Sequence, residues 1–166
     1  MHWKEGATPL ELSPADVQRV LSLFLNETGE RYSEASVRHL PIPAWGGNLV
    51  LVDAMPAHPE RIRGLLWATP FKDDIVRVAA FAIDANAQGQ GWGSLAWDRF
   101  VRSAWAQGYR KVQLEVKAEN EGAQRFYRAR GLTVKATLEG YYQSGMGYMM
   151  QGPLQAPAQP NPYAPQ

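Results

Sequence analysis

The sequence contains no cysteine, which excludes disulfides, thiolate metal ligands and cysteine nucleophiles. It also lacks a Gly-Lys pair, so it cannot form the nucleotide-binding loop that requires Gly-Lys-Ser or Gly-Lys-Thr. No apolar run approaches the length of a membrane span, and the first residues have no apolar segment of signal-peptide type. We therefore expect a cytoplasmic protein that makes no membrane contact.

An excess of one charge is also missing. Seventeen Lys and Arg balance sixteen Asp and Glu, which argues against nucleic acid as the main partner because phosphate binding normally requires a basic excess. The three histidines, His2, His39 and His58, are scattered without ligand spacing. We therefore expect no metal site.

What is present suits one globular domain. The chain has 166 residues, 45% of them hydrophobic, enough to bury a sizeable core. Five of the twelve prolines fall within residues 153–166, a composition that buries little. We therefore predict a single domain over 1–152 and a proline-rich tail over 153–166.

Hydrophobic spacing and capping residues predict the order of the elements. Ser13 and Pro14 are typical of a helix start, and apolar residues continue at helical spacing to about Glu27. Ser33 could begin a second helix. Strands are expected at 8–12, 48–54, 62–69, 75–83, 111–116, 132–139 and 148–151, helices at 91–107 and 121–130, and a loop at 140–147. This order predicts an α/β (α+β) domain with a mixed sheet, in which the segment from 78 to 116 forms a parallel crossover.

Residues 86–94, "NAQGQGWGS", join the strand at 75–83 to a helix, and we call them the glycine loop. Backbone amides at a helix N-terminus bind anions, and glycines let an anion approach them closely. A dinucleotide fingerprint fits poorly, because Ser94 replaces its third glycine and five residues separate Ile83 from Gly89. A tight turn without a ligand is the plain alternative.

Two linked motifs resemble the GNAT superfamily of acetyltransferases. The first is Gln88-x-x-Gly91-x-Gly93, which is similar to the acyl-CoA pyrophosphate loop of that superfamily. The second is "LEVKAENEGAQRFYRARGL", whose matching positions are Val116, Asn120, Ala123, Phe126-Tyr127 and Gly131-Leu132. Leu114-Glu115-Val116 and Tyr141-Tyr142 further resemble the N-terminal amine acetyltransferases of ribosomal-protein-alanine type. The resemblance spans about 78–150.

The resemblance implies a mixed, mostly antiparallel sheet of six to seven strands with about four helices. It also implies transfer of an acetyl group from acetyl-CoA to a primary amine, first of all the α-amine of a protein or peptide N-terminus. A small amine, such as a polyamine, amino acid or aminoglycoside, is the alternative acceptor. A CoA-binding module without catalysis is the alternative class. The expected assembly is a monomer or homodimer.

The resemblance also implies roles for individual residues. Glu115 would be the general base and Tyr127 the proton donor to the CoA thiolate. Tyr141 and Tyr142 would line the amine entrance. The cofactor-binding residues would be Ala82, Ile83, Gln88, Gly89, Gln90, Gly91, Trp92, Gly93, Ser94, Asn120 and Tyr127.

The residues also have plain interpretations. In "KVQLEV", alternation places Glu115 with Lys111 and Gln113, opposite the valines, as on an exposed face. Tyr127 could be part of the core. The sequence also departs from the family at two places. The variable positions of the glycine loop contain no basic residue, and Met146-Gly147 stand where acidic residues often follow the tyrosine pair.

Overall fold

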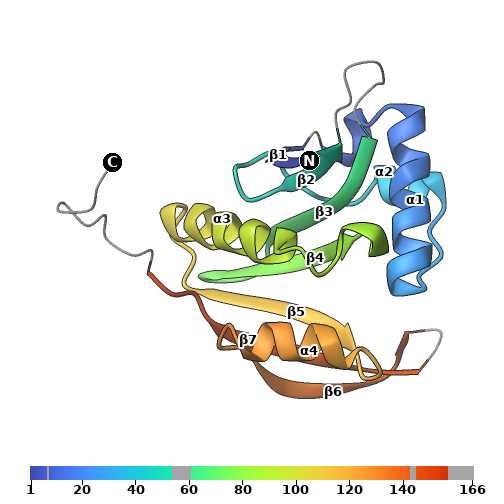
Figure 1. Cartoon of the computed structure of the whole chain (residues 1–166). Coiled ribbons are helices and arrows are strands. Elements are labelled where there is room, and N and C mark those ends of the chain that lie inside the picture. Colours follow the sequence, from blue (N-terminus) through green and yellow to red (C-terminus); the bar gives the residue numbers. More distant parts are fainter. Residues whose placement is uncertain (7, 54–60, 143–144, 157–166) are drawn as a thin grey trace.

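The computed structural model describes residues 1–6, 8–53, 61–142 and 145–156. Seven strands form one sheet in the order β1-β2-β3-β4-β5-β7-β6 (Figure 1). Neighbouring strands are antiparallel except β4 and β5, which are parallel. The strands are β1 His2–Glu5, β2 Leu49–Asp53, β3 Arg61–Pro70, β4 Ile75–Ile83, β5 Lys111–Lys117, β6 Thr133–Tyr142 and β7 Gly145–Pro153. The predicted mixed, mostly antiparallel sheet is confirmed.

Four α-helices flank the sheet, and their starts follow from capping side chains. Ser13 Oγ accepts the amide of Asp16 at 3.1 Å, and Asn120 Oδ1 accepts that of Ala123 at 3.1 Å, so each satisfies one amide of a first turn. Gly29, at φ 74°, ends α1 in the left-handed conformation that glycine adopts without strain. The helices are α1 Pro14–Thr28, α2 Glu34–Arg38, α3 Trp92–Ala106 and α4 Glu121–Arg128, with short 3₁₀ turns η1 Pro9–Glu11 and η2 Ala85–Ala87.

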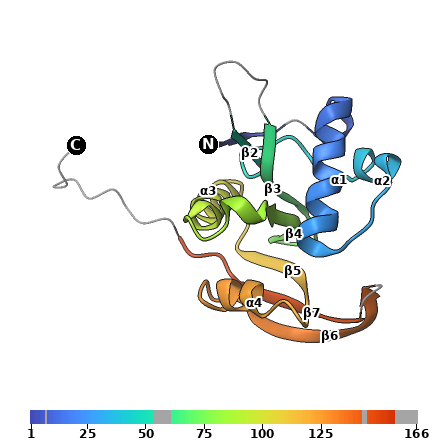
Figure 2. The ribbon, with the colours of Figure 1, turned by 45° about the vertical axis from the view of Figure 1, so that its right-hand side comes forward.

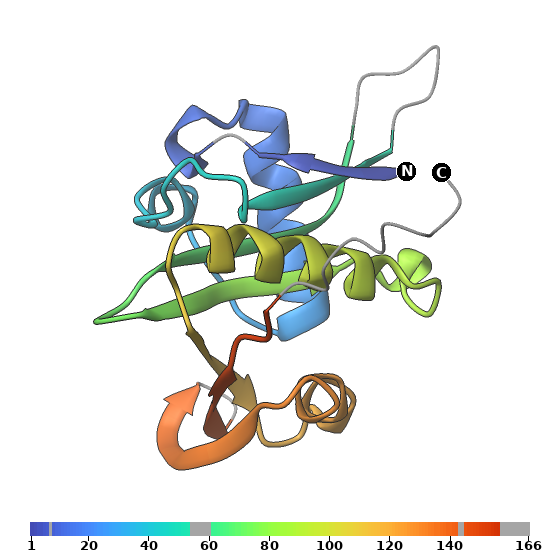
Figure 3. The ribbon, with the colours of Figure 1, turned by 90° about the vertical axis from the view of Figure 1, so that its left-hand side faces the viewer.

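Helices cover both faces of the sheet. In Figure 2, α1 and α3 lie on opposite sides of β3 and β4, and Figure 3 shows α3 in front of these strands with α1 behind them. The α3 side holds one core cluster, which includes Phe100, Leu66 and Leu114. The α1 side holds a second, which includes Val20 and Trp67. Strands β2, β3 and β4 therefore contribute residues to both cores, whereas β1, β5 and β7 contribute to the α3-side core.

The parallel pair β4 and β5 is joined over only part of its length. Its ladder runs from Ile75 opposite Lys111 to Val78 opposite Leu114, although β4 continues to Ile83. On the other edge of β4, a bulge leaves Ala79 out of the register with β3. The two strands therefore separate beyond Val78, within the sheet.

Two details of the predicted order are wrong. The segment 8–12 is not a strand, because Pro9 opens the 3₁₀ turn η1, and the first strand is instead β1, which pairs with β2. The expected loop over 140–147 is also too long. Strand β6 reaches Tyr142 and β7 begins at Gly145, because Gly147 pairs with both Lys117 and Leu138.

The domain remains packed just beyond the predicted boundary at residue 152. Leu154 is buried in the α3-side core, and its amide donates to the carbonyl of Arg110 at 2.8 Å. Pro153 belongs to β7. The rest of the predicted tail, 157–166, lies outside the described residues, and the division at 152 stays a prediction.

Candidate active site

The glycine loop leads from β4 into α3. Gly89 and Gly91 have φ values of 75° and 88°, which side-chain-bearing residues rarely adopt. A Cβ atom on either glycine would meet nothing within 4 Å, so both face open space. Gly93 differs, because its Cβ position would lie 3.5–3.8 Å from Ile83, Phe126 and Phe81. The two left-handed glycines therefore shape the loop around an open volume.

The first turn of α3 presents unpaired amides to this volume. Gly91 is the N-cap and offers no side-chain acceptor, and the first amide to donate within the helix is that of Leu95, to Gly91 O at 3.2 Å. In the described part of the chain, no acceptor receives the amides of Trp92, Gly93 and Ser94. Three orphan amides at the positive end of a helix form an anion site.

Arg130 brings a positive charge to the same turn. Its Nη2 donates to Ser94 Oγ at 2.7 Å, and its guanidinium stacks on the Phe126 ring at 3.5 Å. Burial lowers the pKa of Arg130, and Asp98 opposes that shift. A cation beside a helix N-terminus is electrostatically unfavourable unless an anion joins it. Arg130 thus places a positive charge beside this turn, where the variable positions of the glycine loop have no basic residue.

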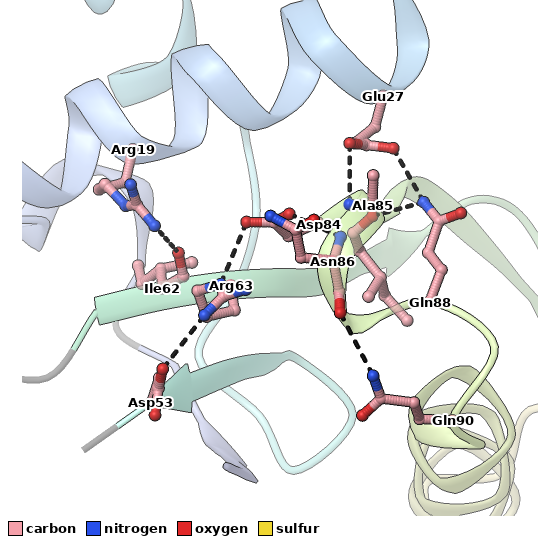
Figure 4. Close-up of polar contacts among 11 residues, drawn as sticks. Arg19, Glu27, Asp53, Ile62, Arg63, Asp84, Ala85, Asn86, Gln88 and Gln90 are labelled. Carbon is pink, nitrogen blue, oxygen red and sulfur yellow. Dashed lines mark hydrogen bonds and ion pairs between the residues drawn. The ribbon is translucent and has the colours of Figure 1, made fainter. Parts of the chain in front are cut away.

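The start of the loop is fixed by Glu27, in the last turn of α1 (Figure 4). Glu27 Oε1 accepts the amide of Ala85 at 3.0 Å, and Oε2 accepts Nε2 of Gln88 at 2.8 Å. The same Gln88 nitrogen donates to Ile83 O at 2.7 Å, and Gln90 donates to Asn86 O at 3.2 Å. The side chains of Gln88 and Gln90 therefore hold the loop together. The amides of Ala87 and Gln88 donate to Asp84 O and Ala85 O, so the Gln88 amide, predicted to bind the cofactor, is already used within the protein.

A cavity of about 550 Å³ opens where β4 and β5 separate. Its walls come from both faces of the sheet: from α1 and the segment after it on one side, and from α4 on the other. Among its lining residues are Glu115 of β5, Asn120, which caps α4, and Tyr127 of α4. The two predicted catalytic residues therefore share one cavity, which we call the central cavity.

Glu115 lies on the α1 side of β5, as its alternation with Val116 predicts, but it is not solvent-exposed. Only 15% of its side chain is accessible, because both carboxylate oxygens lie 3.1 Å from Nε of Arg77 on β4. The exposed-face interpretation is therefore wrong. The ion pair fixes the carboxylate at the wall of the central cavity.

Tyr127 approaches the same cavity from the α3 side. Its ring packs on Trp97 and Phe126, with centroids 5.6 Å away in both cases, and only 7% of the residue is exposed. Burial raises the pKa of the Tyr127 phenol above its ordinary value. The hydroxyl is therefore protonated at neutral pH, and the ring is part of the core, as the plain interpretation predicts. The proton-donor role stays a prediction.

The end of β4 turns alternate amides toward the opening. Asp84 N donates to Arg63 O at 2.8 Å, so the antiparallel alternation also directs the Ala82 amide toward β3. The amides of Phe81 and Ile83 then face the β5 side, where the β4–β5 ladder has ended. Of the predicted pair, Ile83 is oriented toward the opening and Ala82 is not. Phe81 joins it there.

Of the other predicted residues, Asn120 lines the cavity and caps α4. Tyr141 and Tyr142 end β6, which pairs with β7, and the start of β7 lies beside the end of β5, since Ala118 N donates to Met146 O at 3.0 Å. The side chains of the two tyrosines lie outside the described part of the structure, so their contact with an amine stays a prediction.

The sequence did not predict three residues that contact the candidate site: Glu27, Arg77 and Arg130. Each acts across a long separation, because its partner lies 36 to 61 residues away along the chain. A charged residue on a strand or helix gives no local signal of such a partner. In the described ranges, no group of three histidine or acidic residues is arranged to hold a metal, and no helix has the length and apolar composition of a membrane span.

The chain belongs to the acetyltransferase (GNAT) family, whose model matches residues 17–132. It is therefore an N-acetyltransferase, and solved neighbours that hold CoA or acetyl-CoA support acetyl-CoA as its acyl donor. The site fits this cofactor, since orphan amides with an adjacent cation suit a diphosphate and the central cavity reaches Tyr127. No curated protein matches the sequence.

Solved structures share the fold across nearly the whole chain. Ard1 from Thermoplasma volcanium is 24% identical, with TM-score 0.74 over 93% of this chain and 98% of that one. The ribosomal-protein-S18-alanine N-acetyltransferase from Escherichia coli is 18% identical, with TM-score 0.67 over 92% and 96%. A chain of the NatC complex bound to Gag peptide and CoA is 17% identical, with TM-score 0.76 over 93% and 98%. At these identities the likeness shows the shared fold.

Proposed function

We propose that the protein acetylates the α-amino group of a protein or peptide N-terminus, with Glu115 as general base and Tyr127 as general acid. The observation that carries the proposal is the central cavity, because it is reached by Glu115 from one face of the sheet and by Tyr127 from the other. The solved neighbours that act on or bind peptide substrates support the acceptor class.

The cofactor would be held by the glycine loop and the first turn of α3. Amides from Gly89 to Ser94 would bind the diphosphate, with Arg130 adding a positive charge. Asn120 and Tyr127 would line the path of the pantetheine arm. The amides of Phe81 and Ile83 would donate hydrogen bonds to the acyl carbonyl, as an oxyanion hole does. When bound, acetyl-CoA supplies an activated thioester whose sulfur requires a proton as it leaves.

Glu115 would take a proton from the acceptor amine, directly or through one water. An α-amino group has a pKa near ~8 and a lysine amine near ~10.4, so the α-amine makes the smaller demand on the base at neutral pH. Arg77 would keep the carboxylate in place through the 3.1 Å contacts with Nε. The lower pKa of the α-amine is therefore the reason to favour it over a lysine as the acceptor.

Tyr127 would hold the proton that the sulfur receives. Because burial raises the pKa of this phenol, its Oη carries a proton throughout the neutral range. Packing against Trp97 and Phe126 leaves the ring little freedom to turn away from the cavity. Tyr127 would therefore hold the proton that a general acid must supply.

The test is free-thiol release from acetyl-CoA with a panel of N-terminal peptides and small amines. Glu115→Gln and Tyr127→Phe should each retain CoA binding by titration calorimetry and lose on the order of 10² to 10⁴ in kcat. The matched controls are Glu121→Gln, on the exposed first turn of α4, and Tyr109→Phe, which packs on Trp45 instead. Both controls should acetylate normally.

Three results would contradict the proposal. Normal turnover in both variants would reject the catalytic roles. Turnover on polyamines or aminoglycosides alone would replace the peptide acceptor with a small amine. CoA binding without thiol release on any amine would indicate a binding module.

A further inference from the structure

The side of the central cavity that faces α1 has an apolar wall. Phe24 of α1, Tyr32 and Leu40 line it, although they come from three separate segments. The Phe24 and Tyr32 rings lie 5.2 Å apart at 55°, and Phe24 belongs to the α1-side core. Phe24 is only 3% exposed and supports the Tyr32 ring, which is 42% exposed, so Tyr32 and Leu40 offer most of the surface that an apolar ligand group can cover.

The floor opposite this wall is made of small side chains. The bulge in β4 leaves Ala79 out of the ladder, so Ala79 and Ala80 both pack against the α1-side core rather than alternating between faces. Both line the cavity. Two consecutive methyl groups on one face leave room for a side chain of the ligand between β4 and the apolar wall.

The charged side chains that line the central cavity are mostly carboxylates. Carboxylates of Glu27, Glu30, Glu115 and Glu119 line the cavity, whereas the lining contains one ammonium, that of Lys117. Lys117 Nζ lies 3.4 Å from Glu30 Oε1, and Arg77 of β4 forms an ion pair with Glu115. Even with both cations counted, carboxylates are in excess. The cavity therefore attracts an ammonium and disfavours a ligand that carries its own carboxylate close to the reacting amine.

We propose that the acceptor is a peptide N-terminus whose first side chain is large and apolar and whose first residues carry no acid. This inference rests on the proposed function and adds the specificity. The first side chain would lie between Ala79-Ala80 and the Phe24-Tyr32-Leu40 wall, which places the α-amine at Glu115. One methylene more or less in such a site changes kcat/KM by about 10–200-fold.

The experiment compares peptides that differ only at the first residue, with Met, Leu, Phe, Ala, Ser, Lys or Glu there, by initial rates of thiol release. Met, Leu and Phe should exceed Ala and Ser by at least about tenfold in kcat/KM, and Glu should be the poorest. Equal rates across the set, or a preference for Ser or Glu, would overturn the inference while the proposed function stood. No turnover on any of the peptides would reject the proposed function as well.

A cavity-filling variant supplies a test that loss of folding cannot imitate. Ala80→Val should lower kcat/KM for Leu and Phe peptides at least tenfold and change that for the Ala peptide much less, so that the preference narrows or inverts. Ala136→Val, on the exposed face of β6, makes the same change outside the cavity and should keep the wild-type profile. An unchanged preference in Ala80→Val would also overturn the inference.

Discussion

Glu27→Gln is expected to loosen the glycine loop and weaken CoA binding, although Glu27 touches neither catalytic residue. A carboxylate in the last turn of a helix opposes the helix dipole by about 0.3–1 kcal/mol, so its position does not serve α1. It serves the loop instead, through Ala85 N at 3.0 Å and Gln88 Nε2 at 2.8 Å. Glutamine preserves the shape and removes one of these two acceptors.

The size of the effect follows from the geometry. A glutamine can present its oxygen to Ala85 or to Gln88 but not to both, and its NH₂ then faces the other donor. A hydrogen bond to a charged group contributes about 1.5–3 kcal/mol, and partial exposure reduces this to about 1–2 kcal/mol here. Because 1.4 kcal/mol is a factor of ten, the Kd for CoA should rise about 5- to 30-fold.

Titration calorimetry with CoA measures the change in Kd, and thermal unfolding measures the change in Tm. A Tm lower by a few degrees together with a higher Kd is the expected pair of results. Glu11→Gln, at an exposed carboxylate in η1, is the control and should leave both unchanged. A wild-type Kd in Glu27→Gln would refute the reasoning, because it would mean that the loop keeps its conformation without the carboxylate.

The link to Gln88 can be isolated with a double-mutant cycle. Gln88→Leu removes the donor and should also weaken CoA binding, since its Nε2 bridges Glu27 and Ile83 O. Once the donor is absent, Glu27→Gln should cost less than it does alone. Fully additive effects would show that the two side chains act on the loop independently.

Three further changes have expected outcomes. Because burial raises the Tyr127 pKa, the phenol should stay protonated through pH 10, and phenolate absorbance attributable to Tyr127 at lower pH would contradict this assignment. Arg130→Met should weaken CoA affinity about tenfold and reduce its salt dependence, and an unchanged titration would exclude the guanidinium from the site. Gly152→Ala should destabilise the fold by about 1–3 kcal/mol in urea unfolding, because its Cβ would collide with Gly131 O, and a wild-type midpoint would show that the backbone moves aside.

The sequence predicts the elements well where a local signal exists. Ser13 caps α1 as its spacing with Pro14 predicts, and β4 has the bounds that its apolar run indicates. The sequence does not predict the elements whose formation depends on pairing with a neighbouring strand. Strand β1 is a four-residue strand without apolar alternation, and it exists because it pairs with β2. Gly145 and Gly147 favour a loop, but Gly147 pairs with both Lys117 and Leu138, and Gly145 pairs with Tyr142.

The candidate site divides along the same line. Alternation in β5 predicts that Glu115 and Val116 face opposite sides of the sheet, and the helix spacing predicts that Tyr127 is packed. Neither pattern contains the parallel register, which sets Arg77 opposite Gln113. Gln113 lies two residues before Glu115, the ion-pair partner of Arg77, on the same face of the sheet. Register depends on the whole crossover through α3, which is why the ion pair could not be predicted while the carboxylate could.

In the proposed mechanism, the separation of β4 and β5 would let an acid on one face of the sheet work with a base on the other. A continuous sheet would keep Glu115, on the α1 side, apart from Tyr127, on the α3 side, by the thickness of its backbone. The ladder ends at Val78 and Leu114, one residue before Glu115. Beyond that point the backbone no longer divides the two faces, and the central cavity connects them. A variant that extended the β4–β5 pairing would therefore abolish turnover while it left every proposed catalytic side chain in the sequence.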